Sequence, residues 1–429
     1  MTKTGKIFEI QKIFSEKNIN TTTIENNDEM ILAVKELAGK IPEYRHPSYI
    51  KHRLADVVMI HFFAMLANAN EWYDIEVFAK AKESWLRKYL DLPYGIPTDD
   101  TIRLIISNLD SDHFYKMVTQ LLLNFMEKTL ELAGINEGEI EPNIIAVDGK
   151  VSKGSKREKT DKDDGKALQT LNVFSVGDGL CLGQEFIEEK RNEIPAAQKI
   201  LEIMDLENTV VTSDAMNCQV DTVKTIVESG GDYVLALKGN HKNFHNAVKE
   251  YFDEEKITEL KNKVGCYKST VCKEHGGTAV REYLISDEID WFAKREEWQK
   301  LSVIGMATRT LIKKNGEATS EIRYFIGSIE KDINLLERAV RGHWGVENNL
   351  HWFLDVVFKD DKNRSMAKAG AKNMQIMKKI ALAILGIVKK SYKLSLAKIR
   401  YKLSLNFETE VEKLFSLLSI QSIRNALGK

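Results

Sequence analysis

The spacing of apolar residues changes near residue 141, and this change constrains the fold more than any other feature of the chain. From there to residue 240 the sequence has three short β-type runs in hairpin order, then a helix, a strand, a helix and a strand. The predicted strands are 143–147, 168–174, 180–187, 209–212 and 233–237. One predicted helix starts near Pro195, before the strand at 209–212, and the other follows that strand and runs through Val227. This succession predicts an α/β fold with helices packed on a mixed sheet.

The flanking regions follow other patterns. Residues 1–140 are expected to form a helical N-terminal domain that binds DNA, with amphipathic helices at 54–66, 75–90, 101–108 and 112–132. Residues 241–330 predict a β-rich insertion, with strands at 267–271, 278–285, 301–309 and 322–329. Helical spacing returns at 334–358. The α/β core is therefore expected to comprise 141–240 and 331–395, and a helical tail is expected at 396–429.

Composition describes an ordinary globular chain. Of the 429 residues, 43% are hydrophobic and 29% are charged, which excludes disorder as the main state. Four cysteines give no disulfide framework and favour a reducing compartment. The first residues lack the apolar core of a signal peptide, and the longest apolar run, 380–388, is far shorter than the ~20 residues that span a bilayer. We therefore expect a cytoplasmic protein without a membrane partner.

The net charge of −1 and the pI of about 6.8 argue at first against a nucleic-acid partner. The charge is unevenly distributed, however. Residues 1–330 hold 43 basic and 54 acidic side chains, whereas residues 331–429 hold 19 basic and 9 acidic ones. Between residues 359 and 402 there are thirteen Lys or Arg and two Asp. This excess predicts that the C-terminal region contacts DNA phosphates.

Three carboxylates are placed where they can converge. Asp148 directly follows one predicted strand and Asp214 closely follows another, and ligand sites in open α/β sheets lie at the carboxyl ends of strands. Glu347 lies on the helix predicted at 334–358. That helix has an apolar stripe and an adjoining polar stripe, namely Val346, Leu350, Phe353, Leu354 and Val357 beside His343, Glu347, His351 and Asp355. Packing the apolar stripe on the sheet would direct Glu347 toward the strand ends.

Three carboxylates without a required cysteine suit a hard cation such as Mg²⁺ or Mn²⁺. Two such ions about 4 Å apart activate a water or a 3′-hydroxyl and stabilise the leaving oxygen in an in-line attack on phosphorus. The ions also offset the mutual repulsion of the carboxylates. An Asp that follows a strand is also commonly a turn former or a helix cap, which is the structural alternative for Asp148 and Asp214 taken singly.

Several segments together resemble a known family. They are RHP at 45–47, LPYGIPTDDTIR at 92–103, IAVDGK at 145–150, TSDAMNCQ at 212–219, LALKGNH at 235–241, RYFIGS at 323–328 and RGHWGVENNLHWFLDVVFKDDKNR at 341–364. In this order they resemble DDE-type insertion-sequence transposases of the ISAs family, also called H-repeat-associated proteins. Related groups have a Lys seven residues after the Glu, where this chain has Leu354.

The resemblance implies an RNase H-like catalytic core in which Asp148, Asp214 and Glu347 are the catalytic residues and hold the metal, with the β-rich insertion between the second Asp and the Glu. It also implies DNA as the partner, both the terminal inverted repeats of an element and a target, a homodimer at work, and action at the bacterial nucleoid. Expected DNA-contacting residues are Lys150, Lys238, Arg341, His343, Asn348, His351 and Arg364.

Other interpretations of these residues stay open. His343, Glu347 and His351 could hold zinc, although positions i, i+4 and i+8 rotate about 80° around a helix, which is wide for one tetrahedral ion. Trp344 and Trp352 could stack on bases, but packing residues are the commoner outcome. Cys266, Cys272 and His275 form a loose set that packing also explains. The lysines from 150 to 166 alternate with acids, so a solvated hairpin arm fits as well as a phosphate clamp.

The function that this sequence favours is a metal-dependent DNA transposase that cleaves at the ends of its element and joins the freed 3′-hydroxyl to target DNA. A structure-specific nuclease would use the same residues without strand joining. A catalytically silent DNA-binding relic is the non-enzymatic alternative. Inverted repeats flanking the coding region would favour transposition over both.

Overall fold

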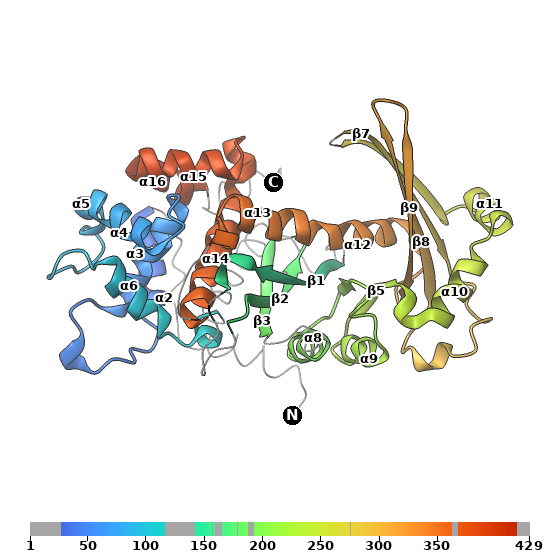
Figure 1. The fold of residues 1–429 in the computed structure, drawn as a ribbon, viewed down its shortest axis with the longest axis horizontal. Coiled ribbons are helices and arrows are strands. Elements are labelled where there is room, and N and C mark those ends of the chain that lie inside the picture. Colours follow the sequence, from blue (N-terminus) through green and yellow to red (C-terminus); the bar gives the residue numbers. More distant parts are fainter. Residues whose placement is uncertain are drawn as a thin grey trace. The chain divides into compact units, whose positions relative to one another are not determined.

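The computed structural model describes residues 27–115, 142–156, 158, 165–177, 179–187, 193–274, 276–362 and 368–417 (Figure 1). These fall into two compact units, and each is described here by itself. The first unit comprises the described residues of 141–150 and 169–348, and the second comprises those of 11–140, 151–168 and 349–429. Most of the helix predicted at 112–132 lies outside the described residues.

A nine-stranded sheet forms the first unit, in the order β3-β2-β1-β4-β5-β9-β8-β7-β6. Its strands are β1 Asn143–Ser152, β2 Leu168–Ser175, β3 Leu180–Ile187, β4 Thr209–Ser213, β5 Asp232–Leu237, β6 Tyr267–Glu274, β7 Gly277–Ser286, β8 Val303–Lys313 and β9 Ala318–Gly327. β1, β4 and β5 run parallel, and β9 pairs antiparallel with β5. Strands β6 to β9 therefore extend the same sheet, and the mixed α/β fold is confirmed.

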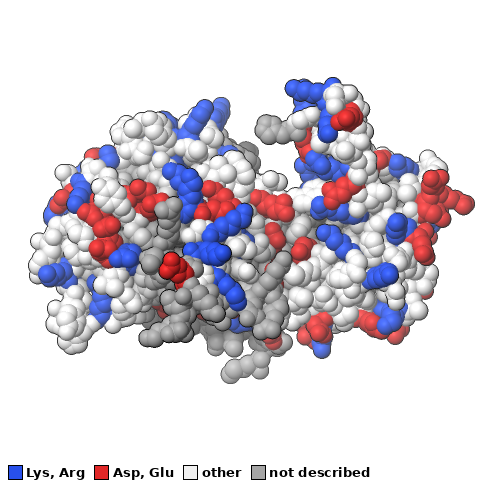
Figure 2. All heavy atoms as spheres, viewed as in Figure 1, with Lys and Arg blue, Asp and Glu red and all other residues white. Residues whose placement is uncertain are grey.

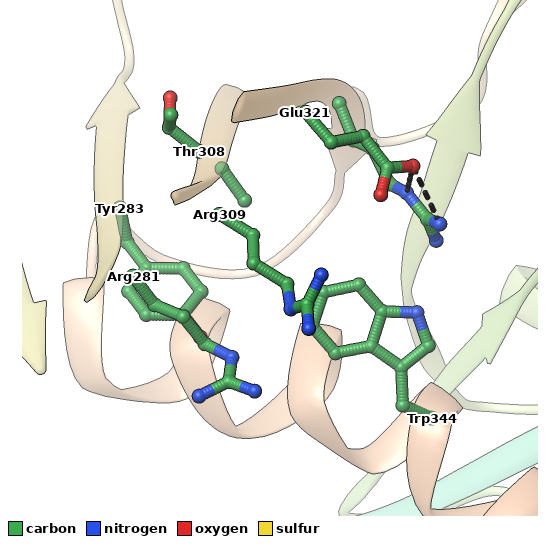
Figure 3. A pocket seen from close by; sticks show the side chains of 8 residues that line it. Arg281, Tyr283, Thr308, Arg309, Glu321 and Trp344 are labelled. Carbon is green, nitrogen blue, oxygen red and sulfur yellow. Dashed lines mark hydrogen bonds and ion pairs between the residues drawn. The ribbon is translucent and has the colours of Figure 1, made fainter. Parts of the chain in front are cut away.

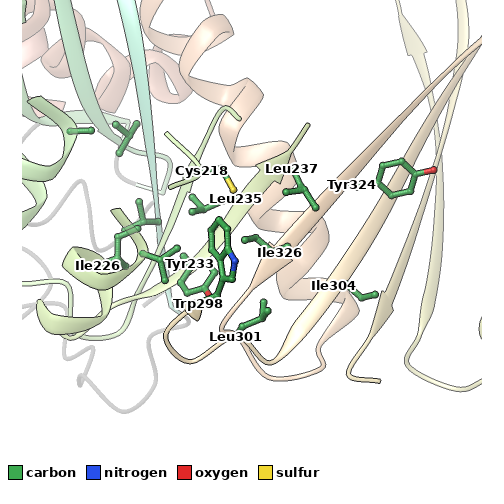
Figure 4. Close-up of a cluster of buried hydrophobic side chains, with 14 of the residues drawn as sticks. Cys218, Ile226, Tyr233, Leu235, Leu237, Trp298, Leu301, Ile304, Tyr324 and Ile326 are labelled. Atoms are coloured by element: carbon green, nitrogen blue, oxygen red, sulfur yellow. The ribbon is translucent and has the colours of Figure 1, made fainter. Parts of the chain in front are cut away.

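Helices cover both faces of this sheet, because its strands alternate apolar residues between the two sides. One face packs against α8 Glu193–Glu202, α9 Val220–Glu228, α10 Lys242–Tyr251 and α11 Glu254–Asn262. Its core includes Tyr233, Leu235 and Leu237 of β5 (Figure 4). The intervening residues Val234 and Ala236 face α12, Ile333–Val346, on the other side.

The second unit is mainly helical. Its helices are α2 Asn27–Ala38, α3 Leu54–Leu66, α4 Trp72–Ala81, α5 Glu83–Leu86, α6 Asp99–Ser107, α13 Trp352–Val356, α14 Lys368–Tyr392, α15 Leu396–Leu405 and α16 Phe407–Leu417. α3 is almost wholly buried and packs with α14. Short 3₁₀ turns occur at Pro47–Tyr49, Lys153–Ser155 and Asp360–Lys362 here, and at Gly239–His241 and Arg295–Glu297 in the first unit.

Two expectations about helices were wrong. The helix predicted at 75–90 is interrupted at Lys82, which separates α4 from α5. The segment predicted to be β-rich from residue 241 instead begins with α10 and α11, whose buried Phe244, Val248 and Leu260 complete the core on that face of the sheet. Each of these two helices has few apolar residues, and they stand among many charged ones, so the sequence shows no clear helical periodicity there.

The basic count at 359–402 was also misleading in part. Lys378, Lys379 and Arg400 belong to it, but all three are buried in the second unit. Lys378 pairs with the buried Asp360 at 3.4 Å. These side chains therefore satisfy internal acceptors instead of DNA phosphates. On the face drawn in Figure 2, basic and acidic side chains are interspersed.

No helix in the described part of the chain is both long enough and apolar enough to cross a membrane.

Close packing of α12 on β1 depends on a glycine. A Cβ atom added at Gly342 would lie 2.9 Å from Cγ2 of Ile144 and 3.2 Å from Cγ2 of Val176. We expect Gly342→Ala to lower the free energy of unfolding by about 1–3 kcal/mol, because neither branched side chain can move aside easily. Urea unfolding measures this effect.

The control is Gly386→Ala in α14, where an added Cβ meets no described heavy atom within 4 Å. There the better helix propensity of alanine should raise stability by about 0.5–1 kcal/mol. If the two variants unfolded at the same urea concentration, α12 would not pack against β1 in this way.

Candidate active site

Two adjacent parallel strands bring Asp148 and Asp214 side by side. Val147 of β1 pairs with Ser213 of β4, and each Asp is the next residue along the chain. The Asp214 carboxylate is oriented locally, because its Oδ1 accepts hydrogen bonds from the backbone N–H groups of Met216 and Asn217, at 3.1 and 3.4 Å. The sequence predicted that Asp148 follows the end of its strand, but β1 continues to Ser152, so Asp148 lies within it. Asp148 and Asp214 are neighbours because each comes directly after the last residue pair of β1 and β4.

Alternation along β1 decides which face these carboxylates occupy. Ile144 packs on the α12 side of the sheet, and Asp148 lies four residues further along the same strand, so it shares that side. α12 crosses β1 at Gly342, where it is closest to Ile144. Glu347 follows Gly342 by five residues, and its negative charge contributes to the raised pKa of Asp148.

The helix changes form at this carboxylate. α12 ends at Val346, and residues Glu347–His351 form a π-helical segment before α13 begins. The sequence predicted one regular helix over 334–358, so the π turn is a correction. A π turn adds one residue to a helical turn and is frequent at functional sites.

The electrostatics of Asp148 show that the acids act on one another. Burial, together with the negative charges of Asp214, Glu347 and Glu193, raises the pKa of Asp148 to about 7. The backbone N–H of Gly149, 2.9 Å from Asp148 Oδ1, opposes this rise. Burial beside other negative charges disfavours the charged form of Asp148, unless a cation accompanies it.

Glu193 was not expected from the sequence. It lies in the first turn of α8 and is 8% exposed, and its Oε1 would be 3.0 Å from a Cβ added at Gly149. Gly149 thus leaves room for the Glu193 carboxylate beside Asp148. An acid in the first turn of a helix is common, so its sequence position gave no signal of this proximity.

His343 is the basic residue placed nearest to this group by its electrostatics. Burial lowers the pKa of His343 to about 4, although the charge of Asp214 opposes the change, and Arg323 and Lys238 contribute to it. The imidazole is therefore neutral at pH 7. Its Nδ1 is buried and has no hydrogen-bond partner among the described residues. A neutral ring of this kind can donate or accept one proton in a hydrogen bond.

The other expected DNA-contacting residues are distributed widely. Lys238, Arg341 and Asn348 are exposed in the first unit, whereas Lys150 is 6% exposed and interacts within the protein. His351 belongs to the second unit. Arg364 lies outside the described residues, as does His275 of the loose Cys/His set. The DNA contacts of all seven residues stay predictions.

The donor set suits a hard divalent cation, because carboxylate oxygens are the ligands that Mg²⁺ and Mn²⁺ prefer. Within the described residues, no group of three or more His, Cys, Asp or Glu side chains is arranged to hold a metal ion. The raised pKa of Asp148 shows that the acids nevertheless repel one another. A cation between them would remove that repulsion.

This repulsion predicts a pH-dependent effect of Asp148→Asn. Asp148 ionises near pH 7 in the folded protein but near pH 4 in the unfolded chain, so the wild type loses stability as the pH rises from about 4 to about 7. The amide does not titrate. Without metal, Asp148→Asn protein should therefore have a higher melting temperature than wild type at pH 8 and the same melting temperature at pH 4. Thermal denaturation in EDTA measures both.

Added Mg²⁺ should raise the melting temperature of wild type at pH 8 and leave that of Asp148→Asn nearly unchanged. Asp221→Asn, at an exposed carboxylate on α9, is the matched control and should follow wild type throughout. Parallel curves for wild type and Asp148→Asn from pH 4 to pH 8 would contradict the electrostatic account of this site.

Comparison with known proteins identifies the family. A family model described as "Transposase DDE domain" matches residues 139–384, and one described as "DDE_Tnp_1-associated" matches residues 36–122. The chain is 36% identical over 359 residues to "Putative transposase YncI" of Escherichia coli O157:H7, covering 83% of this chain and 87% of that protein. It is 31% identical over 352 residues to "H repeat-associated putative transposase YhhI" of Escherichia coli (strain K12), covering 80% and 88%.

A solved structure, the piggyBac transposase synaptic complex with hairpin DNA, aligns over 93% of this chain and 80% of that chain, with 13% identity and a TM-score of 0.34. That likeness is too low to compare the folds. The family match covers more than half of the chain and includes all three carboxylates. The chain therefore belongs to the DDE-type insertion-sequence transposases of the H-repeat family.

Proposed function

We propose that this transposase cleaves DNA at the ends of its element by metal-dependent hydrolysis and joins the freed 3′-hydroxyl to target DNA. The observation that carries the proposal is the placement of Asp148 and Asp214 directly after the last residue pair of the parallel strands β1 and β4, on the face of the sheet that α12 covers, with Glu347 directly after that helix. The mutual effect of their charges supports this grouping.

In this proposal Asp148, Asp214 and Glu347 hold Mg²⁺ or Mn²⁺, two ions in all, as the family generally uses divalent metals. When bound, such ions activate the attacking oxygen and stabilise the leaving one. Asp214 is held in orientation by the backbone N–H groups of the residues that follow it. The neutral His343 can hydrogen-bond to a phosphate oxygen or a water there without adding charge.

Two displacements at phosphorus follow. In the first, a water oxygen bonds to the phosphorus at the element end and the bond to the 3′-oxygen breaks, leaving a 3′-hydroxyl. In the second, that 3′-hydroxyl bonds to a target phosphorus, and the target's own 3′-oxygen leaves with the proton. Each step exchanges one phosphorus–oxygen bond for another, so neither needs an oxidant or a reductant.

The same proposal covers the organisation of the chain. The sheet around β1, β4 and β5 with α12 would be the RNase H-like core, β6 to β9 would be its insertion, and the helical N-terminal residues and the exposed basic residues of the C-terminal region would bind DNA. Two element ends must be held together for joining, which supports a homodimer at work.

An assay of end cleavage and joining tests the proposed function. Purified protein, Mg²⁺ and a labelled fragment carrying the inverted repeat that flanks the gene should yield a nicked strand ending in a 3′-hydroxyl, and then a product joined to an unlabelled plasmid. Nicks without joined product would indicate the nuclease alternative. DNA binding without any nick would indicate the silent relic.

A further inference from the structure

A small hollow opens on the extended part of the sheet, on the α12 side. It has a volume of about 240 Å³, counting the space open to solvent, and Figure 3 shows side chains from β7, β8 and β9 around it, with Trp344 of α12 at its edge. Two neighbouring rows of paired residues form its wall. One row joins Tyr283, Ala307 and Arg323, and the next joins Arg281, Arg309 and Glu321.

The position of these rows explains why the hollow is polar. Tyr283 and Ala307 belong to the apolar cluster that packs against α12. The row with Arg281 and Arg309 lies two residues further along the same strands and on the same face. There the apolar contacts with the helix give way to guanidinium groups, and Arg323 stacks over the Trp344 ring with its Cζ 5.0 Å from the ring centroid.

Two donors in the wall have no acceptor among the described residues. The hydroxyl of Tyr283 and the Nε of Arg281 are both buried without a hydrogen-bond partner, in side chains that are 1% and 8% exposed. Burial raises the pKa of Tyr283 to about 12, so the hydroxyl keeps its proton and is a donor. Buried donors in native proteins nearly always have partners, so this pair is available to an acceptor oxygen of a water or an anion.

The three arginines are held in place by acids. Glu274 of β6 pairs with both Arg281 and Arg309, and Glu321 pairs with Arg323. Three guanidinium groups against two carboxylates leave one positive charge, while the charges of Arg341 and Glu337 on α12, which pair with each other, oppose one another at Tyr283. Guanidinium groups that are fixed in this way are pre-organised for an oxyanion, because their planar N–H forks match phosphate oxygens.

We propose that the hollow formed by Arg281, Tyr283, Arg309 and Arg323, the arginine pocket, binds a backbone phosphate of the DNA on which the transposase acts. This inference rests on the proposed function and adds a positioning site to it. Trp344 precedes Glu347 by three residues on the same helix, so a phosphate in the pocket would fix the strand that approaches this carboxylate. The phosphate of a DNA chain is favoured over a free anion for that reason.

Tyr283→Phe gives the sharpest test, because it removes only the unpaired hydroxyl and keeps the ring in the core. Binding is measured by fluorescence anisotropy of a labelled 30-base-pair duplex of mixed sequence in EDTA, and folding by thermal denaturation. We expect the dissociation constant to rise about fivefold while the melting temperature stays equal or rises. Unchanged DNA affinity in a stably folded Tyr283→Phe protein would overturn the pocket.

Arg309→Gln provides a second test with a charge readout. It should weaken duplex binding about tenfold and reduce the slope of log affinity against log salt by about 1. The matched control is Arg295→Gln, at an exposed arginine of the same unit that pairs with Asp290 away from the pocket. It should keep the wild-type affinity and slope. Equal slopes for wild type and Arg309→Gln would overturn the proposal.

A free anion is the other source of the same chemistry. Inorganic phosphate should compete with the duplex only weakly, at tens of millimolar. If phosphate instead protects wild type from heat and Tyr283→Phe less, while both bind duplex equally, the pocket is a phosphate site and the DNA proposal is wrong. These binding measurements use no metal, so a failure of cleavage and a failure of the pocket are separate results.

Discussion

Asp214→Asn and Glu347→Gln should each reduce the rate of nicking at the element end by about 10³-fold or more. In the proposed mechanism, metal ions held by these carboxylates would supply several kcal/mol of transition-state stabilisation, and each 1.36 kcal/mol is a factor of ten in rate. Both amides keep the size of the acid, so the fold should persist. The measurement is single-turnover nicking of the labelled fragment in Mg²⁺, with DNA affinity in EDTA measured in parallel.

Asp221→Asn is the control for this experiment, since it neutralises an exposed carboxylate on α9 seven residues after Asp214. It should nick at the wild-type rate. Both active-site variants should still bind duplex DNA in EDTA, because each substitution removes a negative charge and leaves every basic side chain of the protein in place. Nicking by wild type that does not exceed nicking by Asp214→Asn would remove the basis for the catalytic assignment.

Arg400→Ala should be the most destabilising single change in the second unit. The Arg400 side chain is fully buried, and its guanidinium donates to the backbone carbonyls of Met65 and Ala69 and to Oδ1 of Asn70, at 2.8 to 3.1 Å, and also to the carbonyl of Val357. Truncation leaves all of these acceptors buried and unpaired. We expect a loss of at least about 3 kcal/mol, since charged hydrogen bonds are among the strongest.

Thermal and urea unfolding would measure that loss, which corresponds to a fall of about 6 °C or more in melting temperature for a unit of this size. Arg103→Ala is the comparison, because Arg103 is exposed and pairs with Asp100 one helical turn away. It should cost less than about 0.5 kcal/mol. Similar losses for the two variants would mean that the Arg400 contacts contribute little.

Local pattern predicted many of the elements. Residues 54–66 and 180–187 were expected as a helix and a strand, and they are α3 and β3 with the same bounds. Both predictions rest on interactions within a few residues: a continuous apolar helical run in one case, and a strand set off by a glycine turn in the other. α10 and α11 were missed because their apolar residues are few and become meaningful only against the sheet.

Part of the candidate site could likewise be predicted from local sequence patterns, and part depends on tertiary contacts. The type and order of Asp148, Asp214 and Glu347 could be recognised from the chain alone, since strand ends and helix stripes are local patterns. Their shared face depends on the pairing of β1 with β4 and on the close approach of α12 at Gly342. Glu193 came as a surprise because its proximity to Gly149 joins segments that are distant in the sequence.

The charged residues show most clearly where prediction from the sequence stops and the folded structure is needed. Local patterns in the chain were enough to predict an α/β protein of the DDE transposase type whose positive charge gathers in its C-terminal part. Which of those charges are exposed depends on the packing of the chain, because Lys378 and Arg400 are buried and pair with groups inside the protein. It also assembled the arginine pocket from three strands whose residues are paired across the sheet. Local patterns fix secondary structure, but burial and convergence depend on contacts between residues far apart in the chain.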